Sequence, residues 1–441
     1  NKGFIHEAPD QLGMLGAAGK AAFRVWSAET MLGTLREAVK LAFTPPMGPV
    51  SVEIAIDVQK QEIPMPANID PLPVLAPQPA EEAVDRLASA LAGKKRVLLW
   101  LGGGSRHAGD AVARLAKLGF GVVTSVQGRG VLPGDDPHSL GAFNLQPVVE
   151  EFYGTCDAMV VVGSRLRSNE TLTYALGLPQ PLFQIDADPM AEGRSYPVDM
   201  FVCGDSALTL NGLADRLEGK FSAEKSFVKD IQATRAAAEK AVRAALGPYE
   251  ELVDAVIDGV PRDFVWVRDI TLSNTIWGNR LPPLDGSRDG VHALGGGIGQ
   301  GLPMAVGAAL AARKDGRKTL LLAGDGGFAV TLGEIATAKQ ENADIAILLM
   351  NDGGYGVIKN IADAHYGGRR AYTDILGPDW GTLCDSLDIP HWGVTAAADV
   401  PDTLKQAFAA EGPAMVEIDM NAIGAFAHSF AGPPTKAKKE D

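Results

Sequence analysis

The chain has 441 residues, of which 46% are hydrophobic and 21% charged, so it is long enough for two or three ordinary globular domains. Its formal net charge of −14 argues against nucleic acid or an anionic membrane as a partner. No apolar run approaches the roughly 18 residues that a membrane span requires. The 3 cysteines share no motif spacing, which predicts a reducing, cytoplasmic setting and no metal cluster.

The first 62 residues are fewer than an α/β domain usually has. Residues 28–43 have a helical pattern, a Pro-Pro-Met-Gly break follows, and residues 50–56 alternate as a strand before Asp57. Asn1 is not an initiator methionine, so we expect residues 1–62 to be the end of a longer domain. We make no prediction about a targeting segment.

Residues 63–82 form a proline-rich linker, and residues 83–220 then alternate between strand and helix patterns. Such alternation predicts a doubly wound parallel α/β sheet. The expected elements are strands at 96–101, 122–126, 158–162 and 182–185, a glycine turn at 102–104 and a helix at 108–118.

The glycine turn at 102–104 invites a dinucleotide-binding interpretation, but the third glycine of that fingerprint would fall at His107. No acidic residue stands about 20 positions further on. This argues against a nucleotide-dependent oxidoreductase. Residues 163–167 follow a strand and offer two arginines to a phosphate, but a domain that keeps the fold without a ligand is the interpretation we favour.

Residues 221–249 are charged and alanine-rich, which predicts a solvated helical connector. The last domain then runs over residues 250–430 and opens with a strand at 264–268. Thr271, Ser273 and Asn274 follow this strand at the edge where ligands of such sheets bind. They either face a substrate or cap the helix that carries Trp277.

Residues 292–303 read HALGGGIGQGLP, and their glycines would let the main chain touch a ligand. Ile298 lies among these glycines and is either a ligand contact or a core residue under a loop. His292 either faces a substrate or is satisfied by local backbone groups. Alone, the glycine cluster is weak evidence for a site.

Residues 319–359 form one β-α-β unit. We expect strands at 319–323 and 345–350, a turn at 324–327 and a helix at 332–340. Asp325 and Asp352 follow the two strands, and parallel strands end at the same edge of a sheet. Two carboxylates beside glycine-rich main chain suit Mg²⁺ that also holds a diphosphate.

The remaining residues contain fewer signals. We expect a final strand at 414–418 and then a flexible, mildly apolar segment at 424–434. His428 is the only ionisable residue in that segment, which makes it a candidate acid or base. Residues 431–441 form a tail whose end, 436–441, is charged and expected to be disordered.

Gly-Asp-Gly at 324–326 followed about two dozen residues later by Asn-Asp-Gly-Gly-Tyr-Gly resembles the diphosphate-binding motif of thiamine-diphosphate (ThDP) enzymes. Within that group, the chain resembles the acetolactate synthase and benzoylformate decarboxylase family from about residue 10 to 420. The resemblance implies three-domain architecture with only the end of the first, pyrimidine-binding domain present. It implies decarboxylation of a 2-oxo acid with ThDP and Mg²⁺, with or without carboligation to a second carbonyl compound.

The resemblance also assigns roles to residues. Mg²⁺ would be held by Asp325, Asp352 and the Gly354 carbonyl, the Gly296 carbonyl would accept a hydrogen bond from the aminopyrimidine, and Ile298 would bend the cofactor. Further cofactor contacts would come from Gly324, Gly326, Gly327, Tyr355 and Gly356. The family usually has Asn where this chain has Asp352, and the extra charge should favour Mg²⁺ and oppose the diphosphate. Asn351 is the alternative ligand, although the spacing favours Asp352.

In this family, a glutamate of the pyrimidine-binding domain activates the cofactor of a neighbouring subunit. None of the glutamates near the start matches its context, namely Glu7, Glu29, Glu37 and Glu53. The resemblance therefore implies a homodimer or homotetramer whose glutamate lies upstream of this sequence. We expect a chain beginning at Asn1 to bind ThDP weakly without turnover, and a non-catalytic ThDP-binding subunit remains the alternative. Some relatives hold FAD or ADP in the central domain, which we do not expect here.

Overall fold

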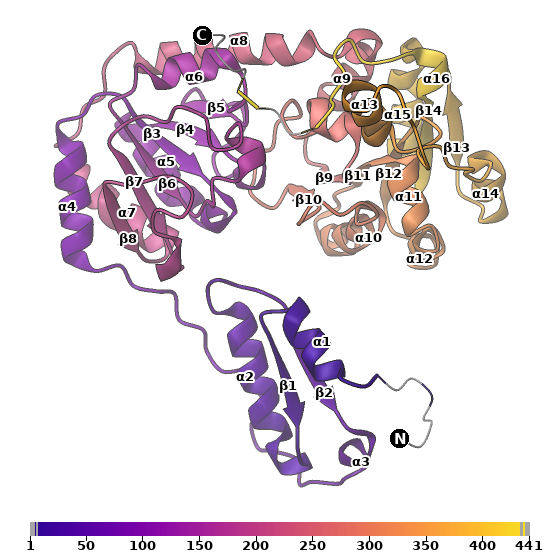
Figure 1. Ribbon diagram of the computed structural model, residues 1–441, viewed down its shortest axis with the longest axis horizontal. Helices are drawn as coiled ribbons and strands as arrows, with labels where there is room; N and C mark the ends of the chain where they lie inside the picture. Colours follow the sequence, from indigo (N-terminus) through magenta and orange to yellow (C-terminus); the bar gives the residue numbers. More distant parts are fainter. Residues whose placement is uncertain (1–4, 6–7, 433–434, 437–441) are drawn as a thin grey trace.

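Two six-stranded parallel sheets form the bulk of the protein, and a smaller two-stranded piece precedes them (Figure 1). The computed structural model describes residues 5, 8–432 and 435–436. The doubly wound α/β class expected from the sequence is confirmed. Among the described residues, no helix is both long and apolar enough to cross a membrane.

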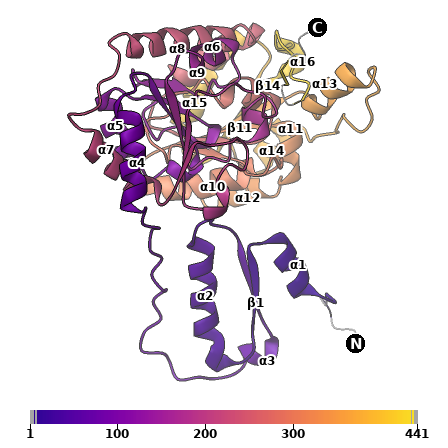
Figure 2. The same cartoon turned by 60° about the vertical axis from the view of Figure 1, so that its left-hand side comes forward.

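The N-terminal piece lies apart from the two large sheets and is joined to them by the proline-rich linker (Figures 1 and 2). It comprises α1 (Gln11–Ala18), β1 (Ala21–Val25), α2 (Met31–Phe43), β2 (Val50–Ile54) and α3 (Ile56–Gln59). β1 pairs in parallel with β2 and was not expected from the sequence. The helix expected at 28–43 begins as a 3-10 turn, and the expected strand ends at Ile54 because residue 56 already begins α3.

The central sheet has the strand order β5-β4-β3-β6-β7-β8. Its strands are β3 (Val97–Leu101), β4 (Gly121–Thr124), β5 (Ser139–Gly141), β6 (Ala158–Val162), β7 (Leu182–Asp186) and β8 (Met200–Cys203). One face is covered by α4 (Glu81–Ala92), α5 (Gly109–Leu118) and α7 (Ser206–Leu217), the other by α6 (Pro147–Tyr153) and α8 (Phe227–Arg243). Helices on both faces explain why β3 and β6 are continuous apolar runs.

The C-terminal sheet has the order β10-β9-β11-β12-β14-β13. Its strands are β9 (Val265–Arg268), β10 (Gly290–His292), β11 (Thr319–Gly324), β12 (Ile345–Asn351), β13 (His391–Val394) and β14 (Ala414–Asp419). Its helices are α9 (Glu250–Ile257), α10 (Gly301–Ala312), α11 (Asp325–Val330), α12 (Glu334–Gln340), α13 (Gly356–His365), α14 (Trp380–Ser386), α15 (Val400–Ala409) and α16 (Met420–Ile423). The candidate acidic residues therefore follow two central strands, β11 and β12.

The segment after β11 differs from the expected turn. Gly324 is extended and Asp325 begins the short helix α11, so the Gly-Asp-Gly-Gly sequence opens a helix. Phe328, in the middle of α11, is buried and packs edge-on against Trp380 of α14. This packing explains why glycines that usually favour a turn are held in a helix here.

The segment expected to be a solvated connector is also different. α8 has a buried face made by Phe227, Ile231, Thr234, Ala238 and Val242. These residues recur every three or four positions, which is the spacing of one face of a helix. The apolar ones belong to one hydrophobic core with residues of both sheets. The expected helix is confirmed, but it is not solvated on all sides, because this face packs against both sheets.

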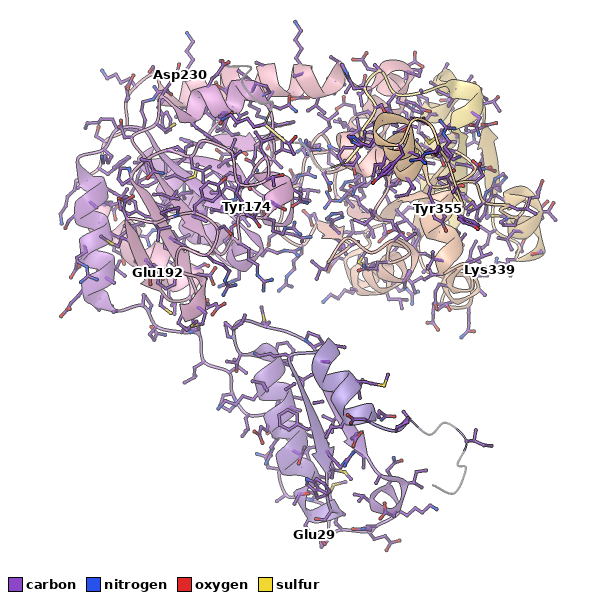
Figure 3. All side chains as sticks on the ribbon, viewed as in Figure 1. Glu29, Tyr174, Glu192, Asp230, Lys339 and Tyr355 are labelled. Carbon is purple, nitrogen blue, oxygen red and sulfur yellow. The ribbon has the colours of Figure 1, made fainter. Side chains whose placement is uncertain are left out.

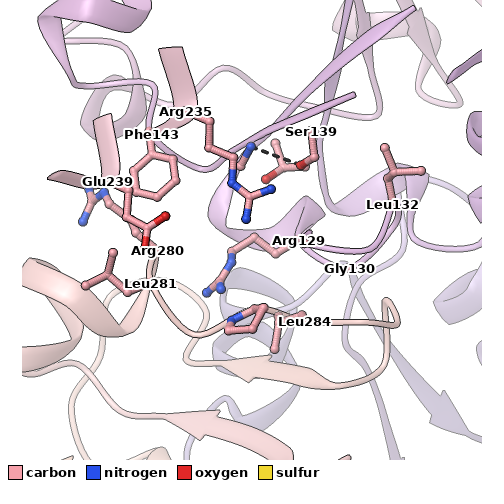
Figure 4. Close-up of a pocket in the computed structure, with 14 residues that line it drawn as sticks. Arg129, Gly130, Leu132, Ser139, Phe143, Arg235, Glu239, Arg280, Leu281 and Leu284 are labelled. Carbon is pink, nitrogen blue, oxygen red and sulfur yellow. Dashed lines mark hydrogen bonds between the residues drawn. The ribbon is translucent and has the colours of Figure 1, made fainter. Parts of the chain in front are cut away.

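Buried arginines donate hydrogen bonds to the loop between β9 and β10, where the two large units meet (Figure 4). Arg129 is 8% exposed and donates hydrogen bonds to the carbonyls of Gly278 and Pro282. Arg268 donates to the same Gly278 carbonyl at 3.2 Å. Burial, with the nearby charge of Arg280, lowers the pKa of Arg129 to about 9. Arg129 therefore remains charged at neutral pH and its hydrogen bonds are charge-assisted.

We expect Arg129→Met to lower the free energy of unfolding by about 2–4 kcal/mol, because the buried Pro282 carbonyl loses its side-chain donor. The Gly278 carbonyl loses one donor and keeps Arg268. Denaturant unfolding measures the difference. Arg114→Met is the matched control, since Arg114 pairs with Asp215 at the surface and should change stability by less than about 1 kcal/mol. Equal losses in the two variants would contradict the role of Arg129.

Candidate functional site

Asp325 and Asp352 meet at the carboxyl edge of the C-terminal sheet. β11 and β12 pair in parallel, with Gly324 opposite Met350. Asp325 follows β11 directly, and Asp352 follows β12. The main-chain N–H of Asp352 donates to Asp325 Oδ1 at 3.4 Å. Both residues line one cavity of about 270 Å³.

Two acidic groups so close together repel each other. Asp325 is 3% exposed, and burial together with the negative charge of Asp352 raises its pKa to about 6. Burial also raises the pKa of Asp352, and the positive charge of Lys359 partly opposes this rise. The Lys359 ammonium donates to the Asp352 carbonyl at 3.1 Å and pairs with Asp374 at 3.0 Å. A divalent cation between the carboxylates would relieve the remaining repulsion.

Glycines make room for this arrangement. A Cβ atom at Gly356 would lie 2.0 Å from Asp352 Oδ2, and one at Gly326 would lie 2.8 Å from the ring of Tyr355. Gly324 and Gly327 line the same cavity. Tyr355 lies near the middle of the C-terminal domain (Figure 3), directly before the first turn of α13. The free N–H groups of that ten-residue helix begin at the cavity, which suits an anion such as a diphosphate.

The glycine loop before α10 forms another wall of this cavity. Gly296 and Ile298 both line it, and Ile298 is 39% exposed. Ile298 is therefore not a core residue of the chain and presents an apolar side chain to the cavity. Gly296 has a φ of +77°, which favours glycine at this position.

Asp269 holds the glycine loop and was not recognised as a functional residue in the sequence. It is fully buried, and Asp269 Oδ2 accepts a hydrogen bond from the main-chain N–H of Gly299 at 3.0 Å. Thr331 holds the same residue by donating to the Gly299 carbonyl at 2.9 Å. The available signal was the position of Asp269 directly after β9, at the same edge of the sheet.

Three of the candidate substrate residues do not line the cavity. Ser273 and Asn274 are 0% and 1% exposed, and residues 274–278 form a π-helical turn. Of the two alternatives, contact with this cavity is not observed, and Ser273 precedes the turn that carries Trp277 without a side-chain capping hydrogen bond. The turn is buried because Trp277 packs against Trp266. His292 lies at the end of β10, where burial and the charge of Arg268 lower its pKa to about 3. Of that loop, Thr271 does line the cavity.

His428 lies beside the site. It is exposed and lines a neighbouring cavity of about 340 Å³, whose wall also includes Asp352, Lys359 and Arg370. Gly356 lines both cavities. The expected flexible segment ends at 434, and residues 433–434 and 437–441 lie outside the described part of the chain. Asp352 also lines both cavities, so His428 lies in the cavity that adjoins the candidate site.

Asn351 is engaged elsewhere. Its side-chain amide donates to Glu417 at 2.7 Å, and its oxygen accepts from the main-chain N–H of Gly353 at 3.1 Å. This supports Asp352 over Asn351 as a cation ligand. Within the described residues, no three His, Cys, Asp or Glu side chains are grouped to hold a metal. A cation here would therefore need main-chain and ligand oxygens besides the two carboxylates.

The central sheet has a cavity of about 590 Å³ at its own carboxyl edge, lined by Gly104, His107, Gly163 and Arg165 among others. Two of its glycines are explained without a ligand, because a Cβ at Gly104 would lie 2.9 Å from Gly163 Cα and one at Gly163 would lie 2.6 Å from the carbonyl carbon of Gly104. Close contact between two loops therefore requires glycine here. The expectation of no FAD or ADP in this domain remains a prediction.

Comparison with known proteins identifies both large domains. Residues 84–213 match the central domain of thiamine pyrophosphate enzymes, and residues 273–418 match their C-terminal TPP binding domain. A probable 2-ketoarginine decarboxylase of Pseudomonas aeruginosa is 32% identical over 349 residues, which cover 73% of this chain and 60% of the relative. A probable chloroplastic acetolactate synthase 2 of Oryza sativa subsp. japonica is 27% identical over 416 residues, 87% of this chain and 62% of the relative. The chain thus spans about three fifths of the length of these relatives.

The repulsion between Asp325 and Asp352 leads to a test in the absence of metal. We expect Asp325→Asn to stabilise the chain in EDTA by about 1–2 kcal/mol, because one of two adjacent buried charges is removed. Thermal unfolding in EDTA and in Mg²⁺ with ThDP measures both states. Wild-type protein should gain stability from the additions and the variant should not.

Asp385→Asn is the control for this experiment, because Asp385 is exposed and lies in the same domain. It should leave both melting temperatures within about 1 °C of wild type. Destabilisation by Asp325→Asn in EDTA would show that the two carboxylates do not repel each other in the folded chain.

Proposed function

The chain belongs to the thiamine pyrophosphate enzyme family, and we propose that it uses ThDP and Mg²⁺ to decarboxylate a 2-oxo acid. The observation that carries this proposal is the meeting of Asp325 and Asp352 over glycine main chain at the carboxyl ends of β11 and β12. Two buried, mutually repelling carboxylates next to a helix N-terminus suit a metal-bound diphosphate.

In this proposal, Asp325, Asp352 and the Gly354 carbonyl hold Mg²⁺. Each supplies a hard oxygen, and Mg²⁺ in proteins is commonly held by one or two carboxylates together with phosphate oxygens. The main chain of Gly326, Gly327 and Gly356 faces the diphosphate. A side chain at these glycine positions would occupy the space next to the main chain that the diphosphate needs. At Gly356, for example, a Cβ atom would collide with Asp352.

The glycine loop receives the organic part of the cofactor. Gly296 and the exposed Ile298 line the cavity, where the Gly296 carbonyl would accept a hydrogen bond from the aminopyrimidine and Ile298 would offer the cofactor an apolar contact. Asp269 keeps this loop in place through Gly299. When bound, ThDP would accept the electron pair that is released when the bond between the substrate carboxylate and its adjacent carbon breaks. The chain contributes binding, orientation and exclusion of water.

The substrate side is less specified. Relatives include a protein named as a probable 2-ketoarginine decarboxylase and others named as acetolactate synthases, so carboligation to a second carbonyl compound is the alternative outcome. His428 is positioned to give or accept a proton from the neighbouring cavity. Figure 3 places Glu29 at the far end of the N-terminal piece, away from the site. In this proposal, as the family resemblance implies, a glutamate from a neighbouring subunit of a homodimer or homotetramer activates ThDP.

A panel of 2-oxo acids with ThDP and Mg²⁺ tests this function, with carbon dioxide release and organic products measured together. Carbon dioxide release supports the decarboxylase, and a coupled product supports the synthase. Binding of ThDP without turnover is expected of a chain beginning at Asn1, and the same result with the upstream glutamate included would favour a non-catalytic subunit. Absence of Mg²⁺-dependent ThDP binding would contradict the proposal.

Asp352 leads to a specific prediction because the family usually has Asn at this position. In Asp352→Asn, an amide oxygen still reaches the metal, but one negative charge is lost. We expect the Mg²⁺ concentration for half-maximal ThDP binding to rise about tenfold, equivalent to about 1.4 kcal/mol. At saturating Mg²⁺, ThDP affinity should be equal or higher, because repulsion of the diphosphate is reduced.

Calorimetric titration of ThDP at several Mg²⁺ concentrations measures this dependence. Asp363→Asn is the control, because Asp363 lies on the same helix, α13, and pairs with Arg370 at the surface. If Asp352→Asn and Asp363→Asn both follow the wild-type Mg²⁺ dependence, Asp352 is not a ligand.

A further inference from the structure

A chain of hydrogen bonds holds the turn that follows β12. Asn351, the last residue of β12, lies next to β14, and its side-chain NH₂ donates to Glu417 Oε1 at 2.7 Å. Asn351 Oδ1 accepts the main-chain N–H of Gly353 at 3.1 Å. Because a carboxylate only accepts hydrogen bonds, Glu417 determines which end of the amide faces Gly353.

The turn held in this way, residues 351–354, includes two of the proposed metal ligands. Gly353 has a φ of +66°, and an asparagine side chain bonded to the main chain two residues further on stabilises such a turn. The turn sets the direction of the Asp352 side chain and of the Gly354 carbonyl. Without this hydrogen bond, repulsion from Asp325 would be free to move Asp352 away.

His391 fixes Glu417 from the other side. His391 Nε2 lies 3.0 Å from Glu417 Oε2, so each carboxylate oxygen has its own partner. The two side chains are only 15% and 19% exposed. His391 belongs to the edge strand β13, which pairs with β14 with Gly393 opposite Glu417. The carboxylate is therefore held against rotation between two strands.

We propose that Glu417 is a positioning residue for the metal site and acts through Asn351, with His391 orienting its carboxylate. This inference rests on the proposed function, because it concerns how the same site is held. Glu417 does not line the cavity and is not a ligand itself. Lys359 holds the opposite side of the turn through the carbonyls of Asp352 and Gly353. The turn is thus supported on both sides, and Glu417 supplies the support from the sheet.

Glu417→Met tests the proposal, since it keeps the length of the side chain and removes both acceptors, so Asn351 and His391 lose their partner. Groups that orient metal ligands typically contribute 10–100-fold to metal affinity. We expect the Mg²⁺ concentration for half-maximal ThDP binding to rise about 10–100-fold, followed by tryptophan fluorescence without substrate. Turnover at saturating Mg²⁺ and ThDP should stay within about twofold of wild type. The control is Glu411→Gln, an exposed residue on the loop before β14.

A double-mutant cycle separates positioning from a general loss of stability. If Glu417 acts through Asn351, the double variant Glu417→Met with Asn351→Ala should bind Mg²⁺ no more weakly than Asn351→Ala alone. Additive losses, or an unchanged Mg²⁺ dependence in Glu417→Met while wild type binds normally, would overturn this inference alone. Failure of wild-type protein to bind ThDP with Mg²⁺ would overturn the proposed function and this inference with it.

Discussion

The candidate site depends on two carboxylates, those of Asp325 and Asp352, which the fold holds together although burial and mutual repulsion both disfavour their charged forms. Asp325 and Asp352 are adjacent because β11 and β12 are paired in parallel with a fixed register, so the residues after the two strands must meet. Glycines clear the space that the side chains need, and a Cβ at Gly356 alone would collide with Asp352. This arrangement supports the proposed Mg²⁺ site, because a cation between the two carboxylates would relieve their repulsion.

The groups around the two carboxylates explain how that arrangement is maintained. Lys359 donates hydrogen bonds to main-chain carbonyls of the turn after β12, and Glu417 holds the same turn through Asn351. Asp269 performs a similar task on the glycine loop across the cavity. Farther away, α8 and the arginines around the loop at 278–290 join the two large sheets, so the C-terminal domain is supported by the central one. Polar contacts thus shape the site, and the shared apolar core supports it.

The sequence predicted those features that follow from local pattern. The strands β11 and β12, the spacing of Asp325 and Asp352 and the glycine loop at 292–303 could all be identified because each lies in one continuous segment. The local pattern was misleading at α11, where burial of Phe328 outweighs the turn preference of glycine, and at α8, where composition concealed the regular spacing of Phe227, Ile231 and Ala238. Asp269 and Glu417 could not be assigned because their partners are distant in the sequence. Only the strand order places β14 beside β12 and the glycine loop beside β9.

The most direct test of the central claim is a crystal structure of this chain with ThDP and Mn²⁺, in which anomalous scattering locates the metal. Mn²⁺ shares the preference of Mg²⁺ for carboxylate and carbonyl oxygens. The account predicts one peak about 2.1–2.2 Å from oxygens of Asp325, Asp352 and Gly354, with the diphosphate completing the coordination. A bound ThDP with its metal on Asn351, or away from these carboxylates, would contradict it.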